Sequence, residues 1–220
     1  MMQPLDIRTL NNNTFKNNLL GVLVAFLLIG NTYAQKDALG MDEAQIVVMA
    51  RPQKDGKILL RWAVTTPLAW KKLNTYGYNL TRYTITRNKT TLTEPVEKYI
   101  GVFKPKPVDE WLPLIEENDN AAVLAQSIYG EGFSIEGFDQ LSAIINLAEE
   151  QEQRFTWGLY AADQDYDAAQ MAGLAYVDID IQPNEKYVYK VTSLVPEDEM
   201  PIKEGGVFIG LQDYEPLPVP

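Results

Sequence analysis

Three short apolar-rich runs near the start of the chain are separated by polar turns, and the third alternates between its two faces with a period of two. They are IVVMARP (46–52), KILLRWAV (57–64) and YNLTRYTITRN (78–88). All are rich in β-branched and aromatic residues and are separated by turn signals, so they predict strands. In the third run, one face carries Tyr78, Leu80, Arg82 and Thr84. A fourth strand is predicted over VEKYIGVF (96–103).

Between residues 109 and 175 apolar residues instead recur every three or four positions. Residues 139–162 place an apolar stripe opposite glutamates, which predicts a long helix capped by Asp139. Shorter helices are predicted over 121–129, with a cap among residues 118–120, and over 166–172. A further turn is expected over 109–117.

The strand period then returns in three more runs: YVDIDI (176–181), KYVYKVTSLV (186–195) and GGVFIGLQ (205–212). The pattern therefore divides the chain into first strands (35–108), a helical insert (109–175), last strands (176–214) and a Pro-rich tail or linker (215–220). An insert of this size buries only a small core alone. We therefore expect it to pack on the strands as one composite unit.

The first 34 residues have the layout of a secretory signal. Arg8 and Lys16 precede an apolar run over 19–30, and small residues precede a cleavage site near Ala34. A permanent anchor is the alternative, but the apolar run is shorter than the roughly 20 residues that a membrane-spanning helix needs. We expect export to the cell envelope, the cell surface or the medium, with no stable membrane span after cleavage.

Composition removes several kinds of chemistry. The chain has no Cys and no His, which excludes disulfides, His-based triads and His/Cys metal sites. Its net charge is −11, which disfavours nucleic acid as a partner. Fourteen of the acids lie between Asp109 and Ala175, where Arg154 is the single basic residue. The acidic segment coincides with the helical insert.

Four fragments resemble a fibronectin type III module. Leu60 and Trp62 stand in the second strand as an apolar residue and a core tryptophan, and GYNLTRY (77–83) is similar to the third-strand pattern. Ile181, Pro183 and the run Tyr187–Val191 resemble the corner into the sixth strand. The resemblance implies a mainly β fold, an immunoglobulin-like antiparallel sandwich, here with three to four helices between its fourth and fifth strands.

The resemblance also implies structural roles for individual residues. Tyr187 would be the corner tyrosine, with its ring inward and its hydroxyl bonded to upstream backbone. The residues expected to build the sandwich interior are Trp62, Tyr78, Leu80, Tyr187, Tyr189 and Val191.

Three acidic groups are candidate sites. Asp178 and Asp180 form a D-x-D pair, but in an alternating strand they share one face, which favours a solvated outer face over a metal-dependent transferase. Asp163, Asp165 and Asp167 imitate a calcium loop, yet the glycine and glutamate of an EF-hand are absent, so helix capping is the simpler interpretation and an irregular calcium site the alternative. A hydrolase would need two paired carboxylates among Glu116, Glu117, Asp119, Glu149 and Glu150.

Aromatic residues in or beside the insert are candidates for partner binding. They are Trp70, Trp111, Phe133, Phe138, Trp157 and Tyr160. Such rings either pack the insert on the strands, anchor a protein partner or stack on sugar. The leading hypothesis is a non-enzymatic module for contact with a protein partner or neighbouring domain, with no cofactor. The alternatives are a carbohydrate-binding module using Trp111 or Trp157, and the hydrolase.

Overall fold

The computed structural model describes residues 43–130 and 140–216, and within it the side chains of residues 140–147 are not described. The expected leader, Phe133, Phe138, the Asp139 cap and the last residues of the tail lie outside the described residues.

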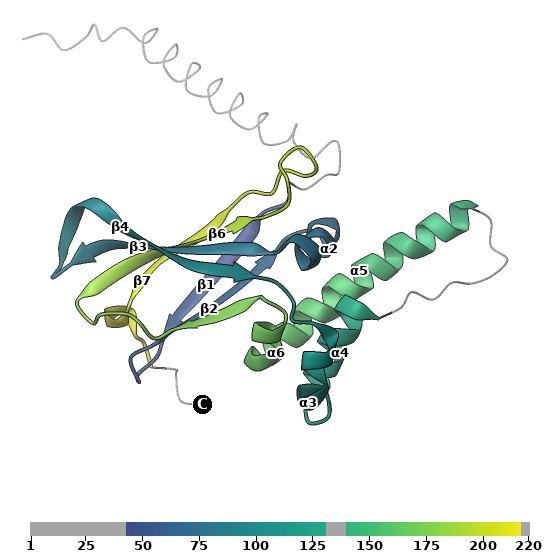
Figure 1. The fold of residues 1–220 in the computed structure, drawn as a ribbon, viewed down its shortest axis with the longest axis horizontal. Coiled ribbons are helices and arrows are strands. Elements are labelled where there is room, and N and C mark those ends of the chain that lie inside the picture. The colour runs from purple at the N-terminus through teal and green to yellow at the C-terminus, as the bar shows by residue number, and fades with distance from the viewer. Residues whose placement is uncertain (1–42, 131–139, 217–220) are drawn as a thin grey trace, which may run out of the picture. The chain divides into compact units, whose positions relative to one another are not determined.

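Seven strands form two antiparallel sheets in the described part of the chain. The strands are β1 (Ile46–Pro52), β2 (Ile58–Val64), β3 (Tyr78–Arg87), β4 (Thr90–Phe103), β5 (Ala175–Asp178), β6 (Glu185–Ser193) and β7 (Gly205–Gly210). One sheet has the order β1-β2-β5 and the other β4-β3-β6-β7. The expectation of a mainly β chain is corrected to mixed α/β, because long helices accompany the strands (Figure 1).

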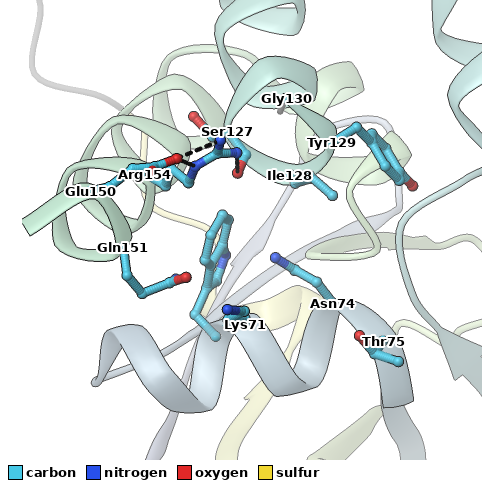
Figure 2. Close-up of a pocket in the computed structure, with 11 residues that line it drawn as sticks. Lys71, Asn74, Thr75, Ser127, Ile128, Tyr129, Gly130, Glu150, Gln151 and Arg154 are labelled. Atoms are coloured by element: carbon cyan, nitrogen blue, oxygen red, sulfur yellow. Dashed lines mark hydrogen bonds and ion pairs between the residues drawn. The ribbon is translucent and has the colours of Figure 1, made fainter. Parts of the chain in front are cut away.

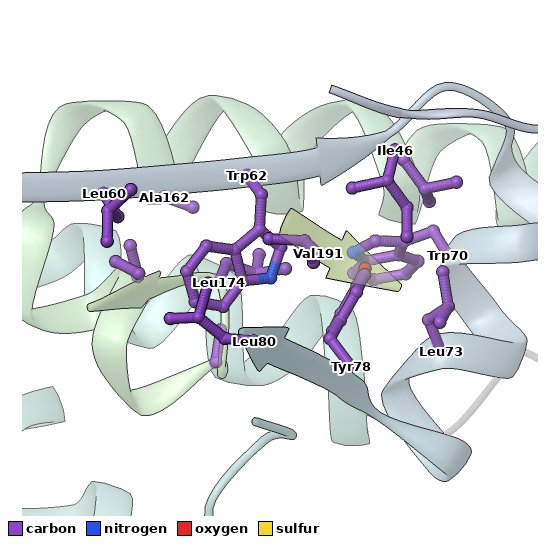
Figure 3. Packing of buried hydrophobic residues seen from close by; sticks show 14 of the residues in the cluster. Ile46, Leu60, Trp62, Trp70, Leu73, Tyr78, Leu80, Ala162, Leu174 and Val191 are labelled. Atoms are coloured by element: carbon purple, nitrogen blue, oxygen red, sulfur yellow. The ribbon is translucent and has the colours of Figure 1, made fainter. Parts of the chain in front are cut away.

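The two sheets pack face to face around large apolar side chains. The ring of Trp62 on β2 meets Tyr78 of β3 edge to face, with 6.2 Å between ring centroids, and Phe103 at 5.3 Å. Leu80 and Val191 pair across β3 and β6 and point to the same interior. Figure 3 shows Tyr78, Leu80, Val191 and Leu174 in the cluster around Trp62. The four residues predicted to share one face of β3, Tyr78, Leu80, Arg82 and Thr84, are all buried, so this shared face is the inner one.

Backbone hydrogen bonds join the two sheets near the starts of β1 and β7. The Ile46 amide donates to the Lys203 carbonyl at 2.9 Å, and the Lys203 amide donates to the Ala44 carbonyl at 2.8 Å. These bonds form an isolated bridge between Gln45 and Lys203, just before β1 and β7, and hold the starts of the two strands near each other.

Helices fill the chain between β4 and β5. They are α3 (Leu112–Ile115), α4 (Asp119–Tyr129), α5 (Gln140–Gln164) and α6 (Tyr166–Met171), preceded by a 3₁₀ turn over Val108–Trp111. Asn118 caps α4 by accepting from the Ala121 amide at 3.1 Å, and Asp165 caps α6 by accepting from the Ala168 amide at 2.7 Å. In Figure 1 these helices lie together at the end of the sheets opposite the turn that joins β3 and β4.

A ten-residue helix, α2 (Pro67–Tyr76), was not predicted. Pro67 occupies its first turn, where a missing amide hydrogen costs nothing. Ala69, Trp70 and Leu73 are buried along one side, and the helix ends at Gly77, whose φ of 93° suits glycine. Only strands were expected between residues 35 and 108, and that expectation is wrong for residues 67–76.

The prediction that Asp178 lies on a solvated outer face is also wrong. Strand β5 pairs Asp178 with Ile58, whose side chain is inside, so the inner face carries the aspartate. Asp178 is fully buried and accepts from Arg82 Nη1 at 2.7 Å and from the Tyr189 hydroxyl at 2.9 Å. The strand ends there, and the next aspartate, Asp180, is exposed beside Lys98. Burial is possible because a cation and a hydroxyl satisfy the charge.

Candidate functional site

One arginine side chain joins the two main helices of the insert. Arg154 on α5 contacts Glu150 one turn earlier, with Nε at 2.8 Å and Nη2 at 2.7 Å from the same carboxylate oxygen. Arg154 Nη1 also donates to the carbonyls of Gln126 and Ser127 near the end of α4, both at 3.3 Å. A cation is favourable at a helix C-terminus. Arg154 therefore fastens α4 to α5 and has its charge balanced within the protein.

On one side of this ion pair lies a pocket of about 580 Å³ between α2, α4 and α5. Figure 2 shows Asn74 of α2 and Gln151 of α5 pointing toward the space between the helices, with Arg154 and Glu150 at its edge. The volume lies within the roughly 300–1,000 Å³ of typical small-molecule sites. The lining includes Trp70, Lys71, Asn74, Ser127 and Gln151.

Two polar atoms of the pocket are buried without a hydrogen-bond partner among the described residues: Nε1 of Trp70 and Oδ1 of Asn74. One is a donor and the other an acceptor. The Trp70 ring is fixed against α5, because a Cβ on Gly158 would stand only 3.1 Å from Trp70 Cζ2. Both atoms are shielded from solvent, so a ligand in the pocket would reach them only after the lining side chains moved.

On the other side of the ion pair, α4 and α5 form an open groove of about 620 Å³. We call it the α4–α5 groove, and it is lined by Ala122, Val123, Gln126, Ser127, Glu150, Gln153, Arg154 and Trp157. Trp157 is 57% exposed, Tyr160 is 54% exposed and Val123 is 41% exposed. The rings of Trp157 and Tyr160 meet edge to face, with centroids 6.1 Å apart. This side of the helices therefore shows an ordered aromatic pair to solvent.

The charges around the groove are acidic. Glu149 is exposed on α5 about two turns before Trp157, and Asp119 is exposed one turn before Val123 on α4. Neither of them appears in an ion pair within the described residues. Because Arg154 is balanced by Glu150, the net field over the groove is negative.

No family model, curated protein or solved structure matches this chain. Among the helices in residues 43–130 and 140–216, none has the length and apolarity needed to cross a membrane.

The predicted aromatic residues separate into two groups. Trp157 and Tyr160 are exposed at the α4–α5 groove. Trp111 is fully buried; its Nε1 donates to the Lys106 carbonyl at 3.0 Å and its ring meets Tyr129 edge to face. The expectation that Trp111 offers a partner-binding or sugar-stacking surface is therefore wrong, because the ring is buried against the connection between β4 and the helices.

The three aspartates of the calcium-like motif have separate tasks. Asp163 pairs with Arg61 Nη2 at 3.0 Å, Asp165 caps α6, and Asp167 lies in the first turn of that helix. Burial lowers the pKa of Arg61, while the charge of Asp163 opposes that shift. Among the residues whose side chains are described, no cluster of three acidic groups has the geometry to hold a metal ion.

The carboxylates proposed for a hydrolase do not form a buried pair in the described part of the chain. Glu116, Glu117, Asp119 and Glu149 are exposed, and Glu150 is bonded to Arg154. The buried carboxylates of the described residues are instead Asp178 and Glu185, in the strands. Glu185 accepts from Arg87 Nε at 2.6 Å and from the Tyr187 hydroxyl at 2.9 Å.

The six residues predicted to be structural are all buried: Trp62, Tyr78, Leu80, Tyr187, Tyr189 and Val191. The Tyr187 hydroxyl accepts from the Gln182 amide at 2.6 Å, upstream of the strand, and the Arg82 guanidinium lies 4.8 Å from the ring centroid. Burial raises the pKa of Tyr187 to about 12. Burial also raises the pKa of Tyr189, and the neighbouring Asp178 adds to that shift.

Sequence reasoning missed the polar residues of α2 that line the pocket, Lys71 and Asn74, because it predicted no helix there. One signal was present: in PLAWKKLN a proline opens a run in which Leu73 follows Trp70 by three positions and Ala69 by four, the spacing of one helix face.

Proposed function

We propose that this chain is an exported, non-enzymatic β-sandwich module of fibronectin type III type, which contacts another protein through the helices between its fourth and fifth strands. The observation that carries the proposal is the exposed Trp157–Tyr160 pair beside the α4–α5 groove. Large aromatic residues at the edge of a groove are frequent anchors of protein interfaces. The partner-binding residues are thus Trp157 and Tyr160, with Val123 opposite.

The fibronectin type III part of the proposal is supported by topology and by one tyrosine. Seven strands in sheets of three and four, packed face to face, agree with an immunoglobulin-like sandwich. The bond from the Gln182 amide to the Tyr187 hydroxyl agrees with a corner tyrosine at the start of β6. These features give the chain a rigid frame on which helices can be carried.

The helices are held firmly enough to act as a recognition surface. The Tyr166 hydroxyl on α6 donates to the carbonyls of Leu60 and Tyr176 at 3.1 and 2.7 Å, which ties the helices to β2 and β5. Trp70 packs edge to face on Phe155 of α5, with 6.3 Å between centroids. A partner that meets the Trp157–Tyr160 pair would find it already ordered, which lowers the entropic cost of binding.

The test uses residues 35–220 as bait against proteins of the source cell envelope, with bound proteins identified by mass spectrometry. Trp157→Ala is compared with Tyr99→Ala, since Tyr99 on β4 is also 57% exposed. We expect a defined partner to be lost with Trp157→Ala and retained with Tyr99→Ala. Equal recovery with both variants, while circular dichroism shows intact helices, would remove the helices as the contact surface. The export itself is tested by N-terminal sequencing of the protein released from its source, which should begin near Gln35.

A second candidate function, carbohydrate binding, is favoured by the pocket between α2, α4 and α5. Its lining combines the Trp70 ring with the polar side chains of Lys71, Asn74 and Gln151, a mixture of apolar and hydrogen-bonding groups that suits a small polar ligand. Titration with glucose, galactose and N-acetylglucosamine, followed by NMR of the four indole N–H signals, tests it. A selective shift of the Trp70 signal, absent in Asn74→Ala, supports this site. A selective shift of the Trp157 signal would move sugar binding to the exposed ring, and no shift with any of the sugars would exclude these monosaccharides.

A further inference from the structure

The α4–α5 groove also specifies the chemistry of its occupant. Resting on the proposed function, we infer that the partner inserts a basic amphipathic helical segment, with apolar side chains facing the groove and Lys or Arg side chains facing its acidic rim. Three observations carry this inference: the apolar walls, the balanced arginine and the sign of the remaining charges.

The walls of the groove are apolar and come from two different helices. Ala122 and Val123 belong to α4, and Trp157 belongs to α5. An apolar stripe of a partner helix would cover these side chains in the way that amphipathic helices dock between two helices elsewhere. The eleven residues of α4 give a wall about 16 Å long, at 1.5 Å per residue. A segment of three to four turns matches that length.

The floor of the groove does not attract an anion. Its cation, Arg154, is held by Glu150 and by two backbone carbonyls. An acidic partner would have to break these contacts and leave Glu150 without its partner, which is costly in a half-buried position. Because Arg154 is already paired, it attracts a partner's carboxylate less than an unpaired arginine would.

The rim supplies charges of one sign. Glu149 on α5 and Asp119 on α4 are exposed and make no ion pair within the described residues. Opposite charges across an interface speed association and disfavour partners of the wrong sign. A partner with Lys or Arg beside its apolar stripe is therefore complementary to the groove, and an acidic amphipathic partner is not.

Two synthetic peptides provide the probe: the fourteen-residue LKKLLKLLKKLLKL and its acidic counterpart LEELLELLEELLEL. Binding to residues 35–220 is followed by Trp157 fluorescence and by isothermal titration calorimetry. We expect the basic peptide to bind and the acidic peptide to fail. Trp157→Ala should weaken binding by about tenfold or more, because central aromatic anchors carry much of an interface's affinity.

Charge is tested separately from the anchor. The double variant Asp119→Asn/Glu149→Gln should weaken binding several-fold and reduce its salt dependence, since rim charges act mainly through screened attraction. The matched control, Glu94→Gln/Glu97→Gln, removes two exposed acids from β4 and should leave binding unchanged. Equal binding of both peptides, or an equal loss with both double variants, overturns the inference.

Failure of the inference and failure of the proposed function give different results. If the envelope partner is lost with Trp157→Ala but the basic peptide does not bind, the contact surface stands and the basic helical occupant falls. In the opposite case, the basic peptide binds with the expected dependence on Trp157, but envelope partners are recovered equally with Trp157→Ala. The preference of the groove for a basic helix then stands and the proposed function falls.

Discussion

The strands and the helices bury different kinds of side chain. The strand interior is built from large residues, among them Ile58, Leu60, Trp62, Tyr78 and Tyr189. In the described parts of α4, α5 and α6, the fully or almost fully buried apolar residues are alanines apart from Leu124. Each buried methylene contributes about 0.8 kcal/mol, so an alanine contributes far less than a leucine or an aromatic residue.

The helices compensate by borrowing large side chains from their neighbours. Trp70 comes from α2 and Trp111 from the turn before α3, and both are buried against the helices. The two regions therefore hold together by different means, large interdigitated side chains in one and close backbone approach around two tryptophans in the other. Local opening should begin in the helices, where less apolar area is buried per residue.

The largest expected effect lies in the strand interior, where a charge is buried. Asp178→Ala leaves the Arg82 guanidinium buried without its carboxylate and should lower the free energy of unfolding by about 3–5 kcal/mol. Asp180→Ala, two residues away in an exposed position, should change it by less than about 0.5 kcal/mol. Urea unfolding of both variants checks this, and similar losses would show that burial of the pair does not decide the difference.

The next effect tests whether the alanines of the helices are closely packed. Ala161→Leu on α5 adds atoms at a fully buried position and should destabilise the protein by about 1–3 kcal/mol through overpacking. Ala148→Leu makes the same change at an exposed position of the same helix and should be within about 0.5 kcal/mol of wild type. Hydrogen exchange should show that Ala161→Leu loosens the helices and leaves β3 and β6 protected. Loss of protection in both regions alike would mean that they open as one unit.

A smaller effect is expected at the corner of β6. Tyr187→Phe removes the hydroxyl that accepts from Gln182 and donates to Glu185, at a cost of about 1 kcal/mol. Burial raises the pKa of Tyr187 from 10.0 to about 12, so the folded state favours the protonated hydroxyl. Its contribution is complete below pH 10.0 and is lost as the pH rises toward 12. The difference between wild type and Tyr187→Phe in urea unfolding should shrink over that interval, and a constant difference would contradict the hydroxyl's role.

Local patterns predicted the local parts of this structure. The alternation in β3 placed Arg82 on the same face as Leu80, and the polar residues before α4 and α6 included the caps that form, Asn118 and Asp165. These features depend on neighbours a few residues away, and the sequence displays them directly.

The parts that could not be predicted depend on distant residues. A charged residue in a strand usually faces solvent, and Asp178 departs from this because Arg82, 96 residues earlier, meets it in the interior. The pocket likewise forms only where α2, α4 and α5 meet. Trp157 is exposed and Trp111 is buried because of where their segments dock on the rest of the fold. The hydrophobic periodicity of the sequence does not encode these long-range contacts.

The smallest effect on stability should come from Trp157, even though it is one of the largest side chains. Trp157→Ala loses the edge-to-face contact with Tyr160, about 0.5–1.5 kcal/mol, but gains the higher helix propensity of alanine. The Trp157 ring is already 57% exposed in the folded state, so its removal loses little buried apolar area. The free energy of unfolding measured in urea should therefore stay within about 0.5 kcal/mol of wild type. A loss above about 2 kcal/mol would mean that Trp157 holds the helices together as Trp70 does, and the aromatic pair would then be part of the packing instead of a surface for a partner.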